Sequence, residues 1–221
     1  VKDLVVTGMA GGEFGVRGFI DAYHPDTGEL AWRTYTIPGE GEFGNDTWSG
    51  DSWKTGGSAT WITGAYDADL NLIYWGTGNP GPDWNGDVRL GDNLYSDSAL
   101  ALNGDTGEIE WYFQFTPHDV HDWDAIQVPI LADLNIDGQD QRVMMWANRN
   151  AFFYSINAAD GKFLKGSPFA TQTWAQGLDA NGAPVRVPGM EPTYEGIMVS
   201  PPITGGTNWY SPGYSPDTEL F

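Results

Sequence analysis

The chain has 221 residues with no cysteine, and its 30 acidic residues against 10 basic ones give a formal net charge of −20. A surface this acidic repels nucleic acids and anionic membranes, so neither is an expected partner, whereas a basic protein or a cation is. Without cysteine there is no disulfide, zinc–thiolate site or iron–sulfur cluster, and no apolar run approaches the ~20 residues of a membrane span.

The composition favours short strands joined by tight turns, because glycine (30 residues) and tryptophan (11 residues) are abundant while charged residues make up only 18%. Residues 1–8 are typical of a strand that is already under way, and residues 214–221 of a turn between two strands. We therefore expect a fragment that is truncated at both ends. No segment has helical periodicity of useful length.

A hairpin pattern of strand, Asp-Thr-Gly or Asp-Gly turn and second strand recurs along the chain, with glycine supplying the positive φ of the turn. The copies are residues 20–32, 100–111 and 154–165. Further strand patterns are found at residues 65–76, 142–147 and 151–154. Because a hairpin cannot bury its apolar face alone, recurring hairpins predict stacked units, with Trp32 and Trp111 packing between neighbouring sheets. We predict an all-β fold that is part of a β-propeller; a β-sandwich is the alternative.

The segment from Thr116 to Asp124 places three aspartates and two histidines within nine residues. A bound cation is the usual reason to hold like charges together. Asp122 and Asp124 would face the same way on an extended segment, and two oxygen ligands suit a hard cation such as calcium or a trivalent lanthanide. His118 and His121 with a carboxylate could instead hold iron or zinc for hydrolysis or oxidation, but for each histidine alone we favour a turn-forming role.

Several glycine-rich or acidic loops are weak signals when each is taken alone. Residues 11–18 place Glu13 among glycines that allow close backbone approach, and residues 76–85 are a polar loop that follows a strand. Residues 133–138 copy the opening of a calcium-binding loop, but the position that needs glutamate is Met144, so we predict a surface turn.

In their order along the chain, these motifs resemble the catalytic propeller of the pyrroloquinoline quinone (PQQ)-dependent alcohol dehydrogenases, the methanol/ethanol dehydrogenase group. The tryptophan-ended hairpins resemble the tryptophan-docking repeats of that family, which implies part of an eight-bladed propeller. Residues 1–221 would then be a fragment of a single PQQ-binding domain. The matching motifs are Gly-Gly-Glu-Phe-Gly-Val-Arg-Gly at 11–18, Gly-Thr-Gly-Asn-Pro at 76–80, Thr-Pro-His-Asp at 116–119 and Asn-Arg-Asn at 148–150.

The resemblance implies a role for each matching residue. The implied metal ligands are Glu13, Asn79, Asp122 and Asp124. Asp122 is also the implied catalytic base. Trp61 would stack on the quinone ring, Thr60 would bond a quinone carboxylate and Arg149 would bond the quinone oxygens. Further cofactor contacts are implied for Gly11, Gly12, Asn208 and Trp209.

Asp124 carries the implied choice of metal. Calcium-dependent members of the family have a small residue two positions beyond the catalytic aspartate, whereas lanthanide-dependent members have a second aspartate. An extra carboxylate suits a trivalent ion with a high coordination number, so we favour a lanthanide(III) ion over Ca²⁺.

The resemblance implies oxidation of a primary alcohol to an aldehyde, with electrons passed to a cytochrome c. A periplasmic location and a homodimer are also implied. The alternative from another class is a non-catalytic propeller scaffold that binds partner proteins. A scaffold has no need of Glu13, Asn79, Asp122 and Arg149 together.

Overall fold

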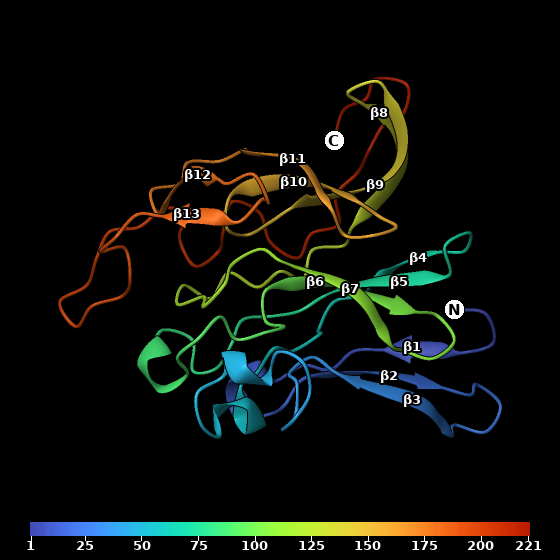
Figure 1. Ribbon diagram of the computed structural model, residues 1–221, viewed down its shortest axis with the longest axis horizontal. Helices are drawn as coiled ribbons and strands as arrows, with labels where there is room; N and C mark the ends of the chain where they lie inside the picture. The colour runs from blue at the N-terminus through green and yellow to red at the C-terminus, as the bar shows by residue number, and fades with distance from the viewer.

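The computed structural model describes all residues from 1 to 221. Its regular secondary structure consists only of strands and short 3₁₀ helices (Figure 1). The strands are β1 (Val5–Thr7), β2 (Phe19–Tyr23), β3 (Leu30–Tyr35), β4 (Ala65–Asp67), β5 (Leu72–Gly76), β6 (Ser98–Asn103), β7 (Ile109–Gln114), β8 (Ile130–Ile136), β9 (Gln139–Ala147), β10 (Phe152–Asn157), β11 (Phe163–Pro168), β12 (Ala175–Leu178) and β13 (Pro184–Arg186). The 3₁₀ helices are η1 (Gly12–Phe14), η2 (Asn45–Thr47), η3 (Ser52–Thr55) and η4 (Gly86–Val88). The all-β prediction is confirmed.

The strands form antiparallel sheets in which each strand pairs with its neighbour in sequence. The sheets are β1–β2–β3, β4–β5–β6–β7, β8–β9–β10–β11 and the hairpin β12–β13. The three recurring hairpins of the sequence are β2–β3, β6–β7 and β10–β11, as predicted. In Figure 1 the sheet β4–β7 lies between β1–β3 and β8–β11.

The central sheet is apolar on both faces, and the period of two along β5 assigns each residue to a face. Leu72 and Tyr74 belong to the core shared with β9 and β10, whereas Ile73 and Trp75 belong to the core shared with β2 and β3. All four side chains are buried. The sheet is therefore held by hydrophobic packing against both of its neighbours.

Trp32 and Trp111, which end the first two hairpins, each pack on the turn glycine of the next hairpin, Gly107 and Gly161 respectively. A Cβ atom on Gly107 would lie 2.4 Å from Cε3 of Trp32, and one on Gly161 would lie 2.6 Å from Cε3 of Trp111. The Trp111 indole N–H also donates to the Ala158 carbonyl at 3.1 Å. Trp32 and Trp111 thus each contact the following hairpin, whereas the tryptophan-docking repeat and the count of eight blades stay predictions.

This contact makes a substitution in the turn costly. Gly107→Ala and Gly28→Ala place a side chain on the same left-handed backbone (φ +73° and +72°), but only Gly107 has a ring against it. The backbone conformation costs about 1–2 kcal/mol in either variant, and overpacking adds about 1–3 kcal/mol at Gly107 alone. Urea unfolding of the full-length protein measures both losses. Equal losses would contradict a packing role for Trp32.

The structure can be compared with the predictions for the two terminal segments and for the turn at residues 133–138. Residues 1–8 form a strand only over Val5–Thr7, because reciprocal hydrogen bonds between Val1 and Leu4 close a turn first. The turn predicted at 214–221 is closed by the bridge between Ser215 and Leu220. Residues 133–138 end in the two-residue turn Asp137-Gly138 between β8 and β9, which confirms a surface turn.

The connections alternate between two ends of the sheets, because neighbouring strands run antiparallel. Short turns gather at one end, on the right in Figure 1 for the first two sheets, and long loops at the other. The long loops at the second end are residues 8–18, 36–64, 77–97 and 115–129, and the short connection 148–151 lies at the same end. Most of the site residues expected from the sequence lie in these loops.

Candidate functional site

Backbone contacts bring the long loops together. The linking hydrogen bonds run from Gly57 N–H to Val16 O, from Ser58 N–H to Asn79 O and from Ala125 N–H to Thr77 O. Gly57 is pressed between two of the loops, since a Cβ atom there would lie 3.1 Å from the carbonyl oxygens of both Gly12 and Asn79. The loop of Glu13 is thus fixed next to the loop of Asn79.

Four of the predicted residues meet in one cluster around Arg149, in which Asn79, Asp124 and Arg149 are buried and Asp122 is half-buried. Its Nη1 donates to Oδ2 of Asp124 at 2.5 Å, and its Nη2 lies 3.9 Å from Oδ2 of Asp122. The other oxygen of Asp124, Oδ1, accepts the backbone N–H of Asn79 at 3.0 Å. The second guanidinium nitrogen also donates to the Ile203 carbonyl. One guanidinium therefore joins both carboxylates, and a backbone bond adds Asn79.

The two carboxylates have raised pKa values. Burial raises the pKa of Asp122 to about 8, with a further increase from the charge of Asp124 that Arg149 partly offsets. Burial raises the pKa of Asp124 to about 6, against the opposing effects of Arg149, the Asn79 N–H and the Trp61 side chain. A cation beside these groups would replace their protons and favour the ionised form.

We therefore expect metal binding to strengthen as pH rises. At a pH below its pKa a carboxyl group is protonated, and it must release that proton to ligate a metal. Metal affinity therefore falls below pH 8 because of Asp122 and again below pH 6 because of Asp124. The change is at most about tenfold per pH unit for each proton released. Terbium titrations of the full-length protein at about pH 5, 6, 7 and 8 measure both falls in affinity. A pH-independent affinity, or an unchanged slope in Asp122→Asn, would contradict this assignment.

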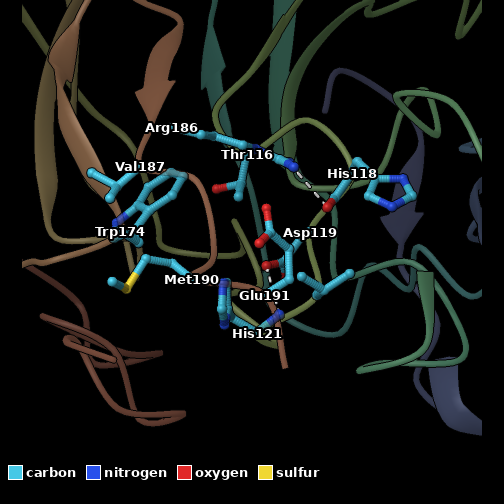
Figure 2. A pocket seen from close by; sticks show the side chains of 10 residues that line it. Thr116, His118, Asp119, His121, Trp174, Arg186, Val187, Met190 and Glu191 are labelled. Carbon is cyan, nitrogen blue, oxygen red and sulfur yellow. Dashed lines mark hydrogen bonds between the residues drawn. The ribbon is translucent and has the colours of Figure 1, made fainter. Parts of the chain in front are cut away.

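The segment around Asp122 is a turn and not the extended strand that the sequence suggested. Asp122 has a left-handed backbone with φ 60°. The Asp119 carboxylate accepts the N–H of His121 at 3.0 Å and the N–H of Trp123 at 2.7 Å, which folds the chain around Asp122. Figure 2 shows the first of these bonds. Asp122 and Asp124 approach each other through this turn and through Arg149, so strand alternation plays no part.

The two histidines have separate surroundings. His118 Nδ1 lies 2.7 Å from the Gly91 carbonyl, whereas the His121 ring stacks on Trp123 with a centroid distance of 4.3 Å. No group of three or more His, Asp or Glu side chains in the chain is arranged to hold a metal ion by itself. These contacts favour packing and turn formation for the histidines.

Two of the other predicted residues, Glu13 and Trp61, are both exposed. The Glu13 side chain is exposed on η1 and makes no hydrogen bond or ion pair. Trp61 is 37% exposed and leaves part of its ring open. Gly12 is buried beside Ala59, and Gly11 precedes it with a left-handed backbone. Metal binding by Glu13 and cofactor contact by Trp61 and the glycines stay predictions.

Thr60 already has partners inside the fold. Its hydroxyl donates to the Phe19 carbonyl at 2.7 Å and accepts the Met9 N–H at 2.9 Å. Asn208 and Trp209 lie on a loop that the Gly206 N–H joins to the Arg149 carbonyl at 2.9 Å. The Asn208 amide donates to Thr204 O. Cofactor contact by these residues also stays a prediction.

Sequence reasoning gave no role to three buried or half-buried residues near the cluster, Asp83, Arg89 and Asp97, and counted Asp119 only as a member of the acidic segment. Asp83 accepts the Asn79 amide N–H at 2.9 Å. Asp97 is fully buried with both oxygens unpaired, and burial, then the charges of Asp119 and Asp124, hold its pKa well above its usual range. Asp119 could have been recognised as a turn former, because aspartate two residues before a turn commonly binds backbone N–H groups.

Two hollows border the turn of Asp122. The one in Figure 2 measures only about 10 Å³, room for about one water molecule, behind Asp119 and His121. The other measures about 250 Å³, and half of the residues that line it are hydrophobic, including Trp84, Trp123 and Ile203. The second hollow has the size and the lining for the carbon chain of a small molecule.

The residues present fit a hard cation and an acceptor-rich cofactor. The atoms of the cluster that could ligate a metal are carboxylate and amide oxygens, which calcium and lanthanide ions prefer. The Nε of Arg149 and the amide nitrogen of Asn148 are buried without a partner, so donors remain for a ligand rich in oxygen. The partly exposed ring of Trp61 could add a flat surface for a planar ring.

Comparison with known proteins identifies the family. Residues 1–167 match the model of the glucose/ethanol/alcohol dehydrogenase β-propeller domain. The whole chain aligns with 41% of the length of the quinoprotein alcohol dehydrogenase PedH of Pseudomonas putida, at 44% identity. It also aligns with 34% of the length of the quinohemoprotein alcohol dehydrogenase ADH IIB of Pseudomonas putida, at 45% identity. A solved europium-containing methanol dehydrogenase superposes on 99% of the chain with a TM-score of 0.94, at 34% identity and over 42% of its own length.

The chain spans about two fifths or less of the length of these relatives. No helix of the structure is long and apolar enough to cross a membrane. The match to the domain model covers three quarters of the chain and favours a propeller over a sandwich. The chain belongs to the family of PQQ-dependent alcohol dehydrogenases and forms part of their β-propeller domain.

Proposed function

We propose that the full-length protein oxidises a primary alcohol to an aldehyde with PQQ and a metal ion, and that a lanthanide(III) ion is preferred over Ca²⁺. The observation that carries this proposal is the meeting of Asp122 and Asp124 at Arg149, beside Asn79. These are the positions that the family motifs assign to the base, the metal ligands and the cofactor arginine. The exposed Glu13 completes the proposed ligand set.

Asp122 is the proposed base. Its carboxylate accepts the proton of the alcohol hydroxyl as the C–H bond opens, and a neighbouring cation keeps it ionised despite its burial. When bound, PQQ and the metal ion supply a two-electron oxidant that is polarised by a Lewis acid. Arg149 orients Asp122 and Asp124 and offers its buried Nε to an oxygen-rich ligand. The hollow lined by Trp84 and Trp123 offers apolar side chains to the carbon chain of the alcohol.

Asp124 supports the preference for a lanthanide. It adds a second negative charge to the cluster, which favours a trivalent ion over a divalent one. The likeness to a solved europium-containing methanol dehydrogenase agrees with this choice. Calcium remains the other metal to be tested.

The proposed electron acceptor is a cytochrome c. The formal net charge of −20 would attract a basic cytochrome. Three relatives are named as quinohemoproteins, which is in keeping with transfer to haem. A periplasmic location and a homodimer stay predictions from the family.

Metal analysis and a visible spectrum of the purified full-length protein separate the candidate functions. The proposal predicts one lanthanide or calcium ion and quinone absorbance. Zinc or iron without quinone absorbance would favour a hydrolase at His118 and His121. A protein that takes up neither metal nor quinone when both are supplied would instead be a scaffold, and the proposal would fail.

A further inference from the structure

Arg89 is a cation that is fully buried, with 0% of its surface exposed. Its hydrogen bonds all go to carbonyl oxygens and one amide oxygen, and none goes to a carboxylate. They run to Pro82 O at 3.1 Å, Asp83 O at 3.1 Å, Asn93 Oδ1 at 2.8 Å and Asp119 O at 2.6 Å. Burying a charged group is costly unless its hydrogen bonds are satisfied, so the segments that Arg89 joins are held tightly in this state.

The two segments that Arg89 joins carry three of the four proposed metal ligands, namely Asn79, Asp122 and Asp124. Asp83 lies four residues after Asn79, in the loop that follows β5. Asp119 begins the turn that contains Asp122, and its carboxylate closes that turn through the N–H groups of residues 121 and 123. One planar guanidinium thus fixes the backbone of the Asn79 loop against the backbone of the Asp122 turn.

Asp83 acts on the side chain of Asn79. Its Oδ1 accepts the Asn79 Nδ2 at 2.9 Å. A carboxamide has one donor end and one acceptor end, so fixing the NH₂ group also fixes the direction of the oxygen. The side-chain oxygen of Asn79, Oδ1, accepts no hydrogen bond within the chain and stays available as a ligand.

We propose that Arg89 and Asp83 are positioning residues of the metal site: Arg89 sets the spacing between the Asn79 loop and the Asp122 turn, and Asp83 turns the Asn79 amide oxygen toward the ion. This inference rests on the proposed function, in which Asn79 and Asp122 ligate the metal. Outer partners of metal ligands commonly contribute about 10- to 100-fold to metal affinity, and the same range is expected here.

Terbium binding to the full-length protein without PQQ tests the inference, with tryptophan-sensitised luminescence as the readout. Asp83→Ala and Arg89→Lys are each expected to weaken terbium affinity by about 10- to 100-fold. Asp83→Asn keeps an oxygen that can accept the Asn79 N–H and should retain most of the affinity. Asp83 is only half-buried, so its variants are expected to fold.

Arg142→Lys is the matched control. Arg142 lies on β9 and pairs with Asp67 at 2.7 Å and Asp133 at 3.3 Å, away from the metal site. We expect this variant to lose thermal stability without a change in terbium affinity. A purely structural role for Arg89 predicts the same pattern for Arg89→Lys, so wild-type terbium affinity in a folded Arg89→Lys would overturn its part of the proposal.

Asn79→Ala separates this inference from the proposed function. If Asn79→Ala binds terbium as the wild type does, the proposed metal site fails. If Asn79→Ala weakens binding while Asp83→Ala and Arg89→Lys do not, only the positioning roles fail. Should Arg89→Lys not fold, Asp83→Ala decides: wild-type affinity overturns the inference, and loss of affinity with recovery in Asp83→Asn supports it.

Discussion

Asp122→Asn in the full-length protein is expected to lower kcat for alcohol oxidation by about 10²- to 10⁴-fold, the usual contribution of a general base. Asparagine keeps the size of the side chain and tolerates the left-handed backbone at φ 60°, but it cannot accept the alcohol proton. Steady-state kinetics at saturating metal and PQQ measure the loss. Saturating metal removes the separate effect of losing one ligand.

The matched control is Asp137→Asn. Asp137 also has a left-handed backbone, with φ 53°, and lies exposed in the turn between β8 and β9. The two variants make the same chemical change on the same kind of backbone, so a general effect of losing an aspartate would be visible in both. Wild-type kcat in Asp122→Asn, with metal and PQQ bound, would remove Asp122 from the role of base.

Asp124→Ala is expected to abolish lanthanide-supported activity while reducing calcium-supported activity much less. Loss of a charged ligand exceeds the ~10- to 100-fold effect of an outer partner, so we expect a fall of more than about 100-fold with lanthanum. The variant also leaves Arg149 and the Asn79 N–H without their acceptor. Activity titrations with lanthanum and with calcium measure the preference.

Asp124→Asn distinguishes the charge of Asp124 from its hydrogen bonds. The amide oxygen can still accept one of the two bonds, from Arg149 or from Asn79, but the second negative charge is gone. A charge-based preference predicts that Asp124→Asn moves toward calcium as Asp124→Ala does. An unchanged metal preference in both variants would refute the assignment of Asp124.

Local signals explain how much of the fold the sequence predicts. The Asp-Thr-Gly turns need a glycine at positive φ, as at Gly28 and Gly107, and the flanking strands need alternate burial, as in β5. These rules involve neighbours in sequence, so the hairpins are predicted correctly. The same reasoning failed for residues 116–124, because the Asp119 carboxylate competes for backbone N–H groups and turns a strand-like pattern into a loop.

The site could be predicted only in part, because some of its contacts join residues that are far apart in sequence. Family motifs identify Asn79, Asp122, Asp124 and Arg149, which the structure brings together. They say nothing of Arg89, whose bond to Asp119 spans 30 residues of sequence. A buried arginine that pairs with no carboxylate leaves no recognisable sequence pattern, since all but one of its acceptors are backbone carbonyls, which every residue possesses.

Reconstitution of the full-length protein with PQQ and either lanthanum or calcium tests the central claim most directly. The readout is reduction of an artificial electron-acceptor dye that depends on added primary alcohol. The account predicts alcohol-dependent reduction that is faster with lanthanum than with calcium. No alcohol-dependent reduction with either metal would contradict it.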